Sequence, residues 1–125
     1  MNFKELSSVF IIAELSANHN GSIQTAVETI RAAKRAGANA IKLQTYRPDT
    51  ITLDSHLIVF LIDVNSIWRG QNLYDLYKKA YTPWEWHPKL FEVAKEEGLI
   101  CLSSPFDITA LDLFEELNNT IYKIA

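Results

Sequence analysis

The chain has 125 residues, of which 48% are hydrophobic, and its 12 Lys and Arg against 15 Asp and Glu give a net charge of −3. This is the composition of an ordinary globular domain with enough apolar residues for one core, and it excludes disordered, collagen-like and coiled-coil classes. The acidic pI of about 5.6 also lacks the basic footprint that nucleic-acid binding needs.

Secreted disulfide scaffolds and membrane proteins are also excluded. Cys101 is the only cysteine, so it has no partner for a disulfide within the chain. The longest apolar runs, 9–13 and 57–62, are far shorter than the roughly 20 residues that cross a bilayer. The first run reaches Glu14 without the cleavage site of a signal peptide. We therefore expect a cytoplasmic protein with no membrane partner.

The first part of the chain predicts a strand, a helix and a second strand. The β-branched run 9–15 is typical of a buried strand, and a polar turn follows at 18–21. Apolar residues then recur at helical spacing from Ser22 to Arg35, with Gly37 as a stop signal. The sequence AIKLQT at 40–45 returns to strand character.

The rest of the chain is less regular. Residues 46–71 stay open, because the apolar run 57–62 suits a strand, a buried helical turn or a loop packed over the core. The elements predicted beyond them are helices at 73–80 and 84–97, a strand at 99–104, a helix at 107–117 capped by Asp107, and the start of a fourth strand at 121–125.

This alternation predicts an α/β fold with a mainly parallel sheet and right-handed crossovers. A parallel strand normally leads into a helix that covers it. Because the sequence ends inside its fourth strand, we expect residues 1–125 to be the front portion of one longer domain.

Each predicted strand carries a polar residue near its carboxyl end, the edge where parallel α/β folds build their sites. Residues two apart on a strand share a face, so Lys42 and Gln44 project together. Lysines donate to phosphate or carboxylate oxygens, and a glutamate accepts from sugar hydroxyls or acts as acid or base, so the set suits an anionic ligand. The candidate residues are Glu14, Lys42, Gln44, Ser103, Ser104 and Lys123 on the strands, and Asn18 and His19 in the turn after the first strand.

Structural explanations compete with this site. An ion pair between Glu14 and Lys42 would by itself be structural, and a lone strand lysine is commonly an edge residue. His19 lies in a loop where catalytic residues concentrate, and both roles stay open for it. His56 and His87 lack metal-site spacing such as HExxH and are expected to be a surface loop residue and a helix-start residue.

Two other residue types have ordinary explanations. Cys101 lies in an apolar strand and is expected to pack there rather than to act as a nucleophile. Trp68, Trp84 and Trp86 could stack on a sugar ring or form a packed cluster with nearby tyrosines, and packing is the commoner case.

Four stretches together resemble the sialic acid synthase family: IIAELSANHNGS, GANAIKLQTY, LSSPFD and YKIA. The resemblance covers nearly the whole chain but only the N-terminal half of the family's enzymes. It implies the N-terminal half of a (β/α)₈ TIM barrel, about three βα units plus the fourth strand. The second half of the barrel and any antifreeze-like domain would be absent from this chain.

The resemblance also implies an activity. Family members condense phosphoenolpyruvate with an N-acetylated amino sugar to a nonulosonic, sialic-acid-like product. The enol carbon attacks the sugar aldehyde, water adds at the second carbon, and phosphate leaves with carbon–oxygen cleavage. Glu14 would contact the sugar, and Lys42, Ser104 and Lys123 would hold phosphoenolpyruvate. Gln44, which shares the KxQT motif with Lys42, would be a substrate-binding residue. Glu14, Lys42 and Lys123 are the expected catalytic residues.

The same resemblance implies a cofactor and an assembly. A divalent metal, usually manganese, would be held by two histidines in the second half of the barrel, so no residue of this chain is expected to be a ligand. It would act as a Lewis acid. The complete enzyme is expected to be a homodimer.

The stretches QTYRPDT and NLYDLYKKAYTPWEWH resemble the pseudaminic acid synthase branch more than the N-acetylneuraminate branch. The expected sugar is therefore a 2,4-diacetamido-2,4,6-trideoxy hexose. N-acetylneuraminate or legionaminate synthase is the alternative within the family. Outside catalysis, the alternative is a truncated half-barrel that only self-associates or binds a partner, and the isolated chain is expected to be inactive.

Overall fold

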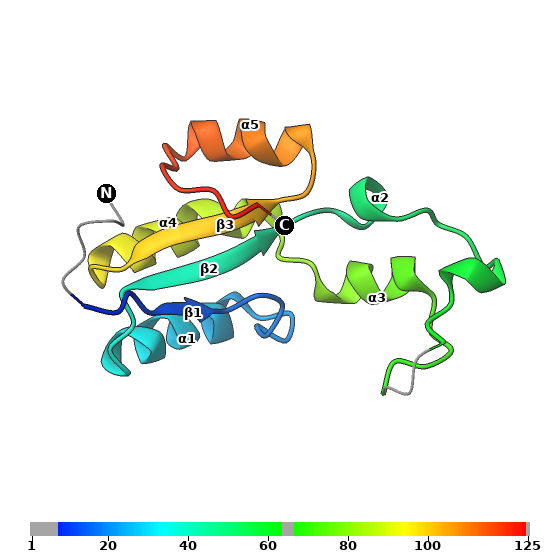
Figure 1. The fold of residues 1–125 in the computed structure, drawn as a ribbon, viewed down its shortest axis with the longest axis horizontal. Helices are drawn as coiled ribbons and strands as arrows, with labels where there is room; N and C mark the ends of the chain where they lie inside the picture. Colours follow the sequence, from blue (N-terminus) through cyan, green and yellow to red (C-terminus); the bar gives the residue numbers. More distant parts are fainter. Residues whose placement is uncertain (1–7, 64–66, 125) are drawn as a thin grey trace.

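The computed structural model describes residues 8–63 and 67–124, and its centre is a parallel sheet (Figure 1). The predicted α/β arrangement is confirmed, since helices connect the strands along the chain. The strands of the sheet, with β2 in the middle, are β1 (Ile12–Glu14), β2 (Ala40–Thr45) and β3 (Ile100–Pro105).

The register of the strands decides which side chains lie beside one another. Glu14 pairs with Lys42 across β1 and β2, and Gln44 pairs with Ser104 across β2 and β3. Because side chains alternate along a strand, Lys42 and Gln44 project from one face and Leu43 from the other. We call the face that carries Lys42 and Gln44 the inner face, and the opposite one the helix face.

Helix α1 (Ile23–Arg35) begins and ends where the sequence predicts. Ser22 is its N-cap, and the Ser22 Oγ accepts a hydrogen bond from the Thr25 amide at 3.2 Å. Beyond the helix, Gly37 has a φ of +91°, a conformation that residues with a Cβ rarely adopt. Glycine at this position therefore ends the helix and turns the chain toward β2.

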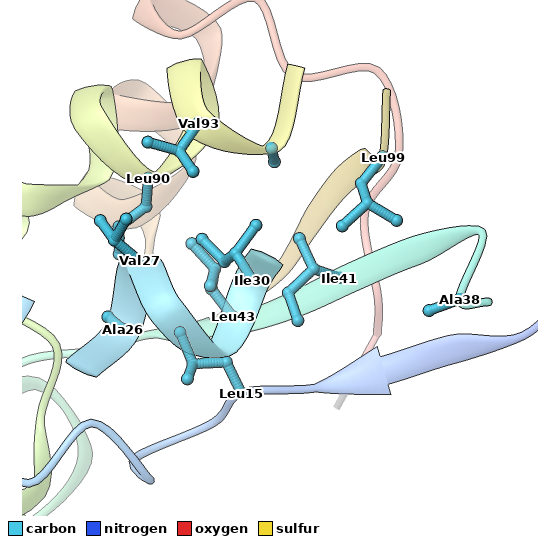
Figure 2. Packing of buried hydrophobic residues seen from close by; sticks show 11 residues of the cluster. Leu15, Ala26, Val27, Ile30, Ala38, Ile41, Leu43, Leu90, Val93 and Leu99 are labelled. Atoms are coloured by element: carbon cyan, nitrogen blue, oxygen red, sulfur yellow. The ribbon is translucent and has the colours of Figure 1, made fainter. Parts of the chain in front are cut away.

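The core lies between the helix face of the sheet and helices α1 and α4 (His87–Glu96) (Figure 2). Ile41 and Leu43 of β2 point toward these helices. They belong to one cluster with Ile30 of α1 and Leu90 of α4, and all four side chains are fully buried. Truncating such a side chain to alanine costs roughly 2–5 kcal/mol. This layer therefore holds the sheet against its helices.

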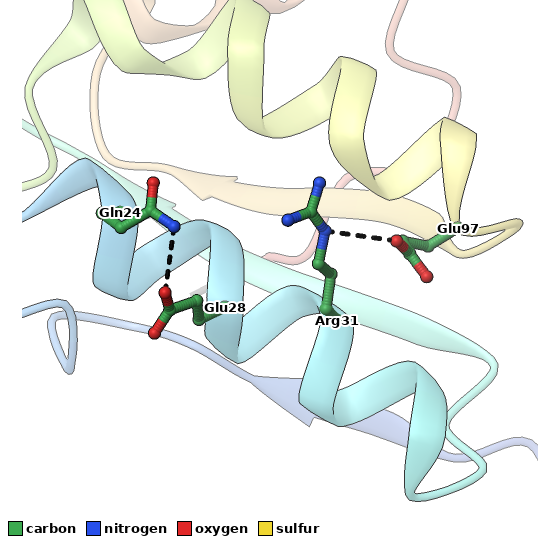
Figure 3. A network of polar contacts seen from close by, with 4 residues as sticks. All are labelled: Gln24, Glu28, Arg31 and Glu97. Carbon is green, nitrogen blue, oxygen red and sulfur yellow. Dashed lines mark hydrogen bonds and ion pairs between the residues drawn. The ribbon is translucent and has the colours of Figure 1, made fainter.

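Two polar contacts lie on the solvent side of α1 (Figure 3). The Gln24 Nε2 donates to the Glu28 Oε1 at 2.9 Å, and the Arg31 Nε lies 3.4 Å from the Glu97 Oε1 at the end of α4. Both members of the ion pair are partly exposed, so it contributes at most about 1 kcal/mol. The apolar layer, not this pair, fixes α1 beside α4.

An arm between β2 and α4 projects away from the sheet (Figure 1). It contains α2 (Pro48–Ile51), a 3-10 turn η2 (Ile58–Phe60) and α3 (Leu73–Ala80). Ile58 and Val59 are 81% and 73% exposed. The run 57–62 is therefore a surface turn, and of the alternatives left open by its sequence, the strand and the buried forms are wrong.

The chain enters α4 through a 3-10 turn, η3 (Trp84–Trp86), so the helix predicted over 84–97 is a short turn followed by α4. Strand β3 then leads to α5 (Ile108–Glu116). The Asp107 side chain caps α5 by accepting from the Thr109 amide at 2.8 Å. The predicted cap is confirmed.

Two strands are shorter than the sequence predicts. β1 begins at Ile12 rather than at Val9. In the sheet formed by the described residues β1 lies at the edge beside β2, and Val9 is 83% exposed. The fourth strand is present as a single parallel bridge between Tyr122 and Ser103. Ala125, its predicted last residue, lies outside the described residues.

Candidate active site

Lys42 and Glu14 form an ion pair on the inner face. The Lys42 Nζ lies 2.9 Å from the Glu14 Oε1, and the lysine side chain is 8% exposed while that of Glu14 is 59% exposed. A buried ammonium group needs a partner, and Glu14 provides one. More than half of the Glu14 side chain nevertheless stays accessible, so this pair leaves Glu14 able to meet a ligand.

Gln44 and Ser104 extend the inner face toward the carboxyl edge of the sheet. They pair directly across β2 and β3, and each lies two residues beyond the pair formed by Lys42 and Leu102. Ser104 is buried and Gln44 is half-buried. The structure thus brings an ammonium, a carboxamide and a hydroxyl together on one face, as the strand period predicts.

Lys123 reaches the same edge through its backbone. Its amide donates to the Ser103 carbonyl at 3.0 Å, and the preceding Tyr122 forms the bridge with Ser103. Lys123 therefore lies beside β3, at the position that pairs with Ser104 if the parallel register of Tyr122 and Ser103 continues by one residue. Its side chain is exposed.

Ser103 differs from its expected role as a ligand donor. Strand alternation turns its hydroxyl to the helix face, where the Ser103 Oγ lies 2.8 Å from the Thr45 Oγ1. The same Thr45 oxygen lies 2.7 Å from the Nε2 of His87, and all three residues are fully buried. Ser103 is thus engaged with other protein groups on the side of the sheet away from Lys42.

Asn18 and His19 lie in the turn between β1 and α1 but in different surroundings. Asn18 is exposed, and its Nδ2 donates to the Leu15 carbonyl at 3.0 Å. His19 is buried, with its Nδ1 accepting from the Gly21 amide at 3.2 Å and its ring edge-on to Trp86 at 5.3 Å. Burial lowers the pKa of His19. The neutral imidazole is enclosed by protein, whereas Asn18 is accessible.

Three aromatic rings meet beyond the ends of β2 and β3. The Tyr46 ring lies edge-on to Tyr77 of α3 at 5.6 Å and to Phe106 at 5.7 Å. Burial, with a smaller effect of Tyr77, raises the pKa of Tyr46 to about 12. The sequence pattern did not single out this cluster, although Tyr46 and Phe106 continue the two-residue period of Gln44 and Ser104.

The three tryptophans lie in different surroundings. The Trp84 Nε1 donates to the Tyr46 carbonyl at 3.3 Å, and the Arg47 guanidinium lies 3.9 Å from the centre of the Trp84 ring. Trp86 packs against His19. For Trp84 and Trp86 the packing explanation therefore holds, while Trp68 lies on the arm and is partly exposed.

Among the described residues, one cavity adjoins the arm and another lies at the far side of the sheet. The smaller, about 220 Å³, adjoins α2 and α3, and the larger, about 630 Å³, lies toward the amino end of β3 and includes Cys101. None of the candidate site residues lines the larger one. Burial raises the pKa of Cys101 to about 12, which agrees with its expected packing role. The residues around the smaller cavity are Arg47, Pro48, Asp49, Tyr74, Lys78 and Tyr81.

Within residues 8–63 and 67–124, no three His, Cys, Asp or Glu side chains gather so that they could hold a metal ion. Over the same residues, no helix combines the length and apolar character that crossing a membrane requires. The groups that the inner face offers are an ammonium, a carboxylate, a carboxamide and a hydroxyl. Such a set suits an anionic ligand that also carries hydroxyl groups.

Comparison with known proteins gives a consistent result. The NeuB family model matches residues 29–125. A pseudaminic acid synthase of Campylobacter jejuni is 49% identical over 124 residues, which are 99% of this chain and 36% of that protein. One from Helicobacter pylori is 50% identical over 115 residues, 92% of this chain and 34% of that protein. The N,N'-diacetyllegionaminic acid synthase of Legionella pneumophila is 34% identical, over 92% of this chain and 32% of its own length.

The chain thus spans about a third of the length of these curated relatives. A crystal structure of the N-acetylneuraminic acid (sialic acid) synthetase of Leptospira borgpetersenii, in complex with citrate, superposes with a TM-score of 0.76 at 28% identity, over 94% of this chain and 36% of the other. Since both the sequence match and the parallel sheet agree with this likeness, the chain belongs to the NeuB family and has the fold of the N-terminal part of its (β/α)₈ barrel.

Proposed function

We propose that this chain supplies part of the active site of an enzyme that condenses phosphoenolpyruvate with an N-acetylated amino sugar. The observation that carries the proposal is the buried Lys42 beside Glu14, at 2.9 Å, on the inner face of a chain about half identical to pseudaminic acid synthases. A cation and an accessible carboxylate at this position suit a substrate pair of which one member is anionic and the other rich in hydroxyls.

The lysines are assigned to phosphoenolpyruvate. Lys42 and Lys123 would bind its carboxylate and phosphate oxygens, and the Ser104 hydroxyl would donate a further hydrogen bond. Charge-assisted hydrogen bonds of this kind strengthen as water is excluded, and they stabilise the negative charge that moves during the reaction.

Glu14 and Gln44 are assigned to the sugar. The Glu14 carboxylate would accept from a sugar hydroxyl, and the Gln44 amide can both donate and accept. The two substrates would then meet over neighbouring strands. The enol carbon of phosphoenolpyruvate bonds to the sugar aldehyde carbon, water adds to the second carbon of the enol, and phosphate departs with its bridging oxygen.

The described residues do not fit the divalent metal that the family resemblance implies. They contain no cluster of three potential ligands, and the inner face offers one carboxylate, which Lys42 already pairs. We propose that a manganese ion in the complete enzyme is held by residues outside the described part of this chain. The roles proposed for Glu14, Lys42, Gln44, Ser104 and Lys123 do not require contact with this metal ion.

Pseudaminic acid is the proposed product. The 49–50% identity to pseudaminic acid synthases, against 34% to the legionaminic acid synthase, supports it over the alternatives. We also propose that the complete enzyme is cytoplasmic and acts as a homodimer.

A competition assay tests this function. The complete protein that contains residues 1–125 is given phosphoenolpyruvate, manganese, N-acetylmannosamine and the 2,4-diacetamido-2,4,6-trideoxy hexose together. We expect the trideoxy sugar to be consumed first, with release of one phosphate per product. Preferential use of N-acetylmannosamine would refute the branch assignment, and no phosphate release with either sugar would refute the function itself.

A further inference from the structure

Three buried polar groups form a hydrogen-bonded chain on the helix face, apart from the residues assigned to substrates. The Thr45 Oγ1 lies 2.8 Å from the Ser103 Oγ and 2.7 Å from the His87 Nε2. All three residues are 0% exposed. The other ring nitrogen of His87, Nδ1, lies 3.3 Å from the Pro83 carbonyl.

The direction of these hydrogen bonds follows from their last acceptor. The Pro83 carbonyl can only accept, so the His87 Nδ1 carries the hydrogen and the Nε2 is left as an acceptor. Thr45 must therefore donate its single hydroxyl hydrogen to His87. Its oxygen then accepts from Ser103. Burial lowers the pKa of His87, in agreement with a neutral ring in this tautomer.

The hydrogen bonds between Ser103, Thr45 and His87 join the backbone segments that carry the proposed substrate contacts. Thr45 follows Gln44 on β2, and Ser103 precedes Ser104 on β3. The Ser103 carbonyl also accepts from the Lys123 amide at 3.0 Å. Ser103 is thus bonded to β2 through its side chain and to the Lys123 segment through its backbone.

We propose that Thr45, Ser103 and His87 are positioning residues, which hold Gln44, Ser104 and Lys123 in register from the far side of the sheet without touching substrate. This inference rests on the proposed function, which assigns substrate contacts to Gln44, Ser104 and Lys123. Displacements near 1 Å at such contacts lower catalytic efficiency by about 10- to 100-fold, so a hydroxyl chain that fixes the strand ends has a measurable effect.

The first test compares hydroxyl removal with hydroxyl retention in the complete protein. Thr45→Val keeps the side-chain shape but leaves Ser103 and His87 without their shared partner, and it should lower kcat/KM by about 10- to 100-fold. Thr45→Ser keeps the hydroxyl and should restore kcat/KM to within about threefold of the parent. Thr29→Val is the matched control, because the Thr29 hydroxyl donates within α1, to the Thr25 carbonyl at 2.8 Å. An equal loss in Thr45→Ser and Thr45→Val would overturn the proposal.

The second test separates positioning from general destabilisation. Ser103→Ala should raise KM for phosphoenolpyruvate about tenfold while leaving KM for the sugar within about twofold, because Ser103 adjoins Ser104 and the Lys123 segment. Equal rises in both KM values would overturn the proposal. If Thr45→Val does not fold, His87→Gln against His87→Leu replaces it, since the glutamine amide can still accept from Thr45 and leucine cannot. Equal losses in these two variants would likewise overturn it.

A third readout does not depend on condensation activity. In the parent protein the Lys123 amide should exchange slowly with deuterium, and Thr45→Val should speed this exchange at least about tenfold while leaving α1 amides unchanged. An unchanged Lys123 rate would overturn the proposal. If the parent protein shows no condensation, the proposed function fails. The exchange result still decides whether the hydrogen bonds of Thr45 order the strand ends.

Discussion

The Lys42 ammonium and the Glu14 carboxylate come from neighbouring parallel strands and lie 2.9 Å apart, with the lysine buried and the glutamate exposed. This asymmetry matters for function. Within the described part of the chain Glu14 is the ion-pair partner of Lys42. An ammonium has three donors, so further N–H groups remain for an anionic ligand. The pair thus provides a cationic site, and the Glu14 carboxylate compensates the charge of the buried lysine when no ligand is bound.

The first prediction concerns ligand charge. Replacing Lys42 or Lys123 by alanine in the complete protein should weaken phosphoenolpyruvate binding by about 1.5–3 kcal/mol, or roughly 10- to 150-fold in Kd, because a charge-assisted hydrogen bond is lost. Calorimetric titration measures it. Lys89→Ala is the matched control, since Lys89 pairs with Glu92 at 2.6 Å on the outer surface of α4. Unchanged affinity in both site variants would contradict the assignment.

The second prediction concerns pH and His87. Burial lowers its pKa below the ordinary 6.5, and the Pro83 and Trp84 backbones and the nearby Glu85 only partly oppose this. Below pH 6.5 this histidine is protonated in the unfolded chain but stays neutral in the folded chain until the pH reaches its lower folded pKa. The free energy of unfolding is therefore highest above pH 6.5 and falls as the pH drops through the folded pKa. One histidine accounts for at most about 1.4 kcal/mol between pH 6.5 and 5.5.

Urea unfolding of the complete protein at pH 7.5 and 5.5 measures this decrease. His87→Gln should reduce it, because glutamine does not titrate. The buried His19, whose pKa burial also lowers, contributes in the same direction. A decrease as large in His87→Gln as in the parent protein would contradict the prediction.

The third prediction concerns Cys101. Burial raises the pKa of its thiol from 9.0 to about 12, which lowers the thiolate fraction at pH 8 by about a thousandfold. We therefore expect Cys101 to resist alkylation by iodoacetamide in the folded protein and to react readily in urea. Mass spectrometry of the peptide that contains Cys101 follows both reactions. Rapid alkylation under native conditions would contradict the packing role.

The strand period was sufficient to predict the inner face. Lys42 and Gln44 on one side of β2, with Leu43 and Thr45 on the other, follow from alternation alone, and the register confirms the arrangement. The same rule applied to β3 separates Ser103 from Ser104. Residue type alone predicts a ligand donor at both serines beside Pro105, whereas alternation leaves only Ser104 on the inner face.

The remaining features depend on contacts between distant parts of the chain. Thr45 meets His87 across 42 positions of sequence, and no local pattern indicates that a helix-start histidine reaches a strand hydroxyl. The turn at 57–62 was not predictable for a different reason. Its apolar residues predict burial, yet Ile58 is exposed in the described structure.

The fourth prediction concerns the 125-residue chain on its own. β1 is an edge strand in the described sheet, and Ile11, Ile12 and Ile58 are exposed apolar side chains. Open strand edges and apolar surface promote association. We expect the isolated chain to self-associate and to show no condensation with manganese, as measured by light scattering and phosphate release. A monomer that turns over would contradict this.

The fifth prediction concerns the sugar and Phe106. Phe106 stands two residues beyond Ser104, packs edge-on to Tyr46, and is 39% exposed, so part of its ring is available at the carboxyl edge where the sugar is proposed to bind. The proposed trideoxy sugar carries a methyl group at its sixth carbon, and loss of one apolar contact of that size costs about tenfold in specificity. Phe106→Ala should therefore raise KM for the trideoxy sugar about tenfold while KM for phosphoenolpyruvate stays within about twofold. Leu111→Ala, at a similarly exposed apolar position on α5, should change neither value. Steady-state kinetics with each substrate varied in turn makes the comparison, and a rise in both KM values by the same factor would show that Phe106 supports the fold of the strand ends rather than selecting the sugar.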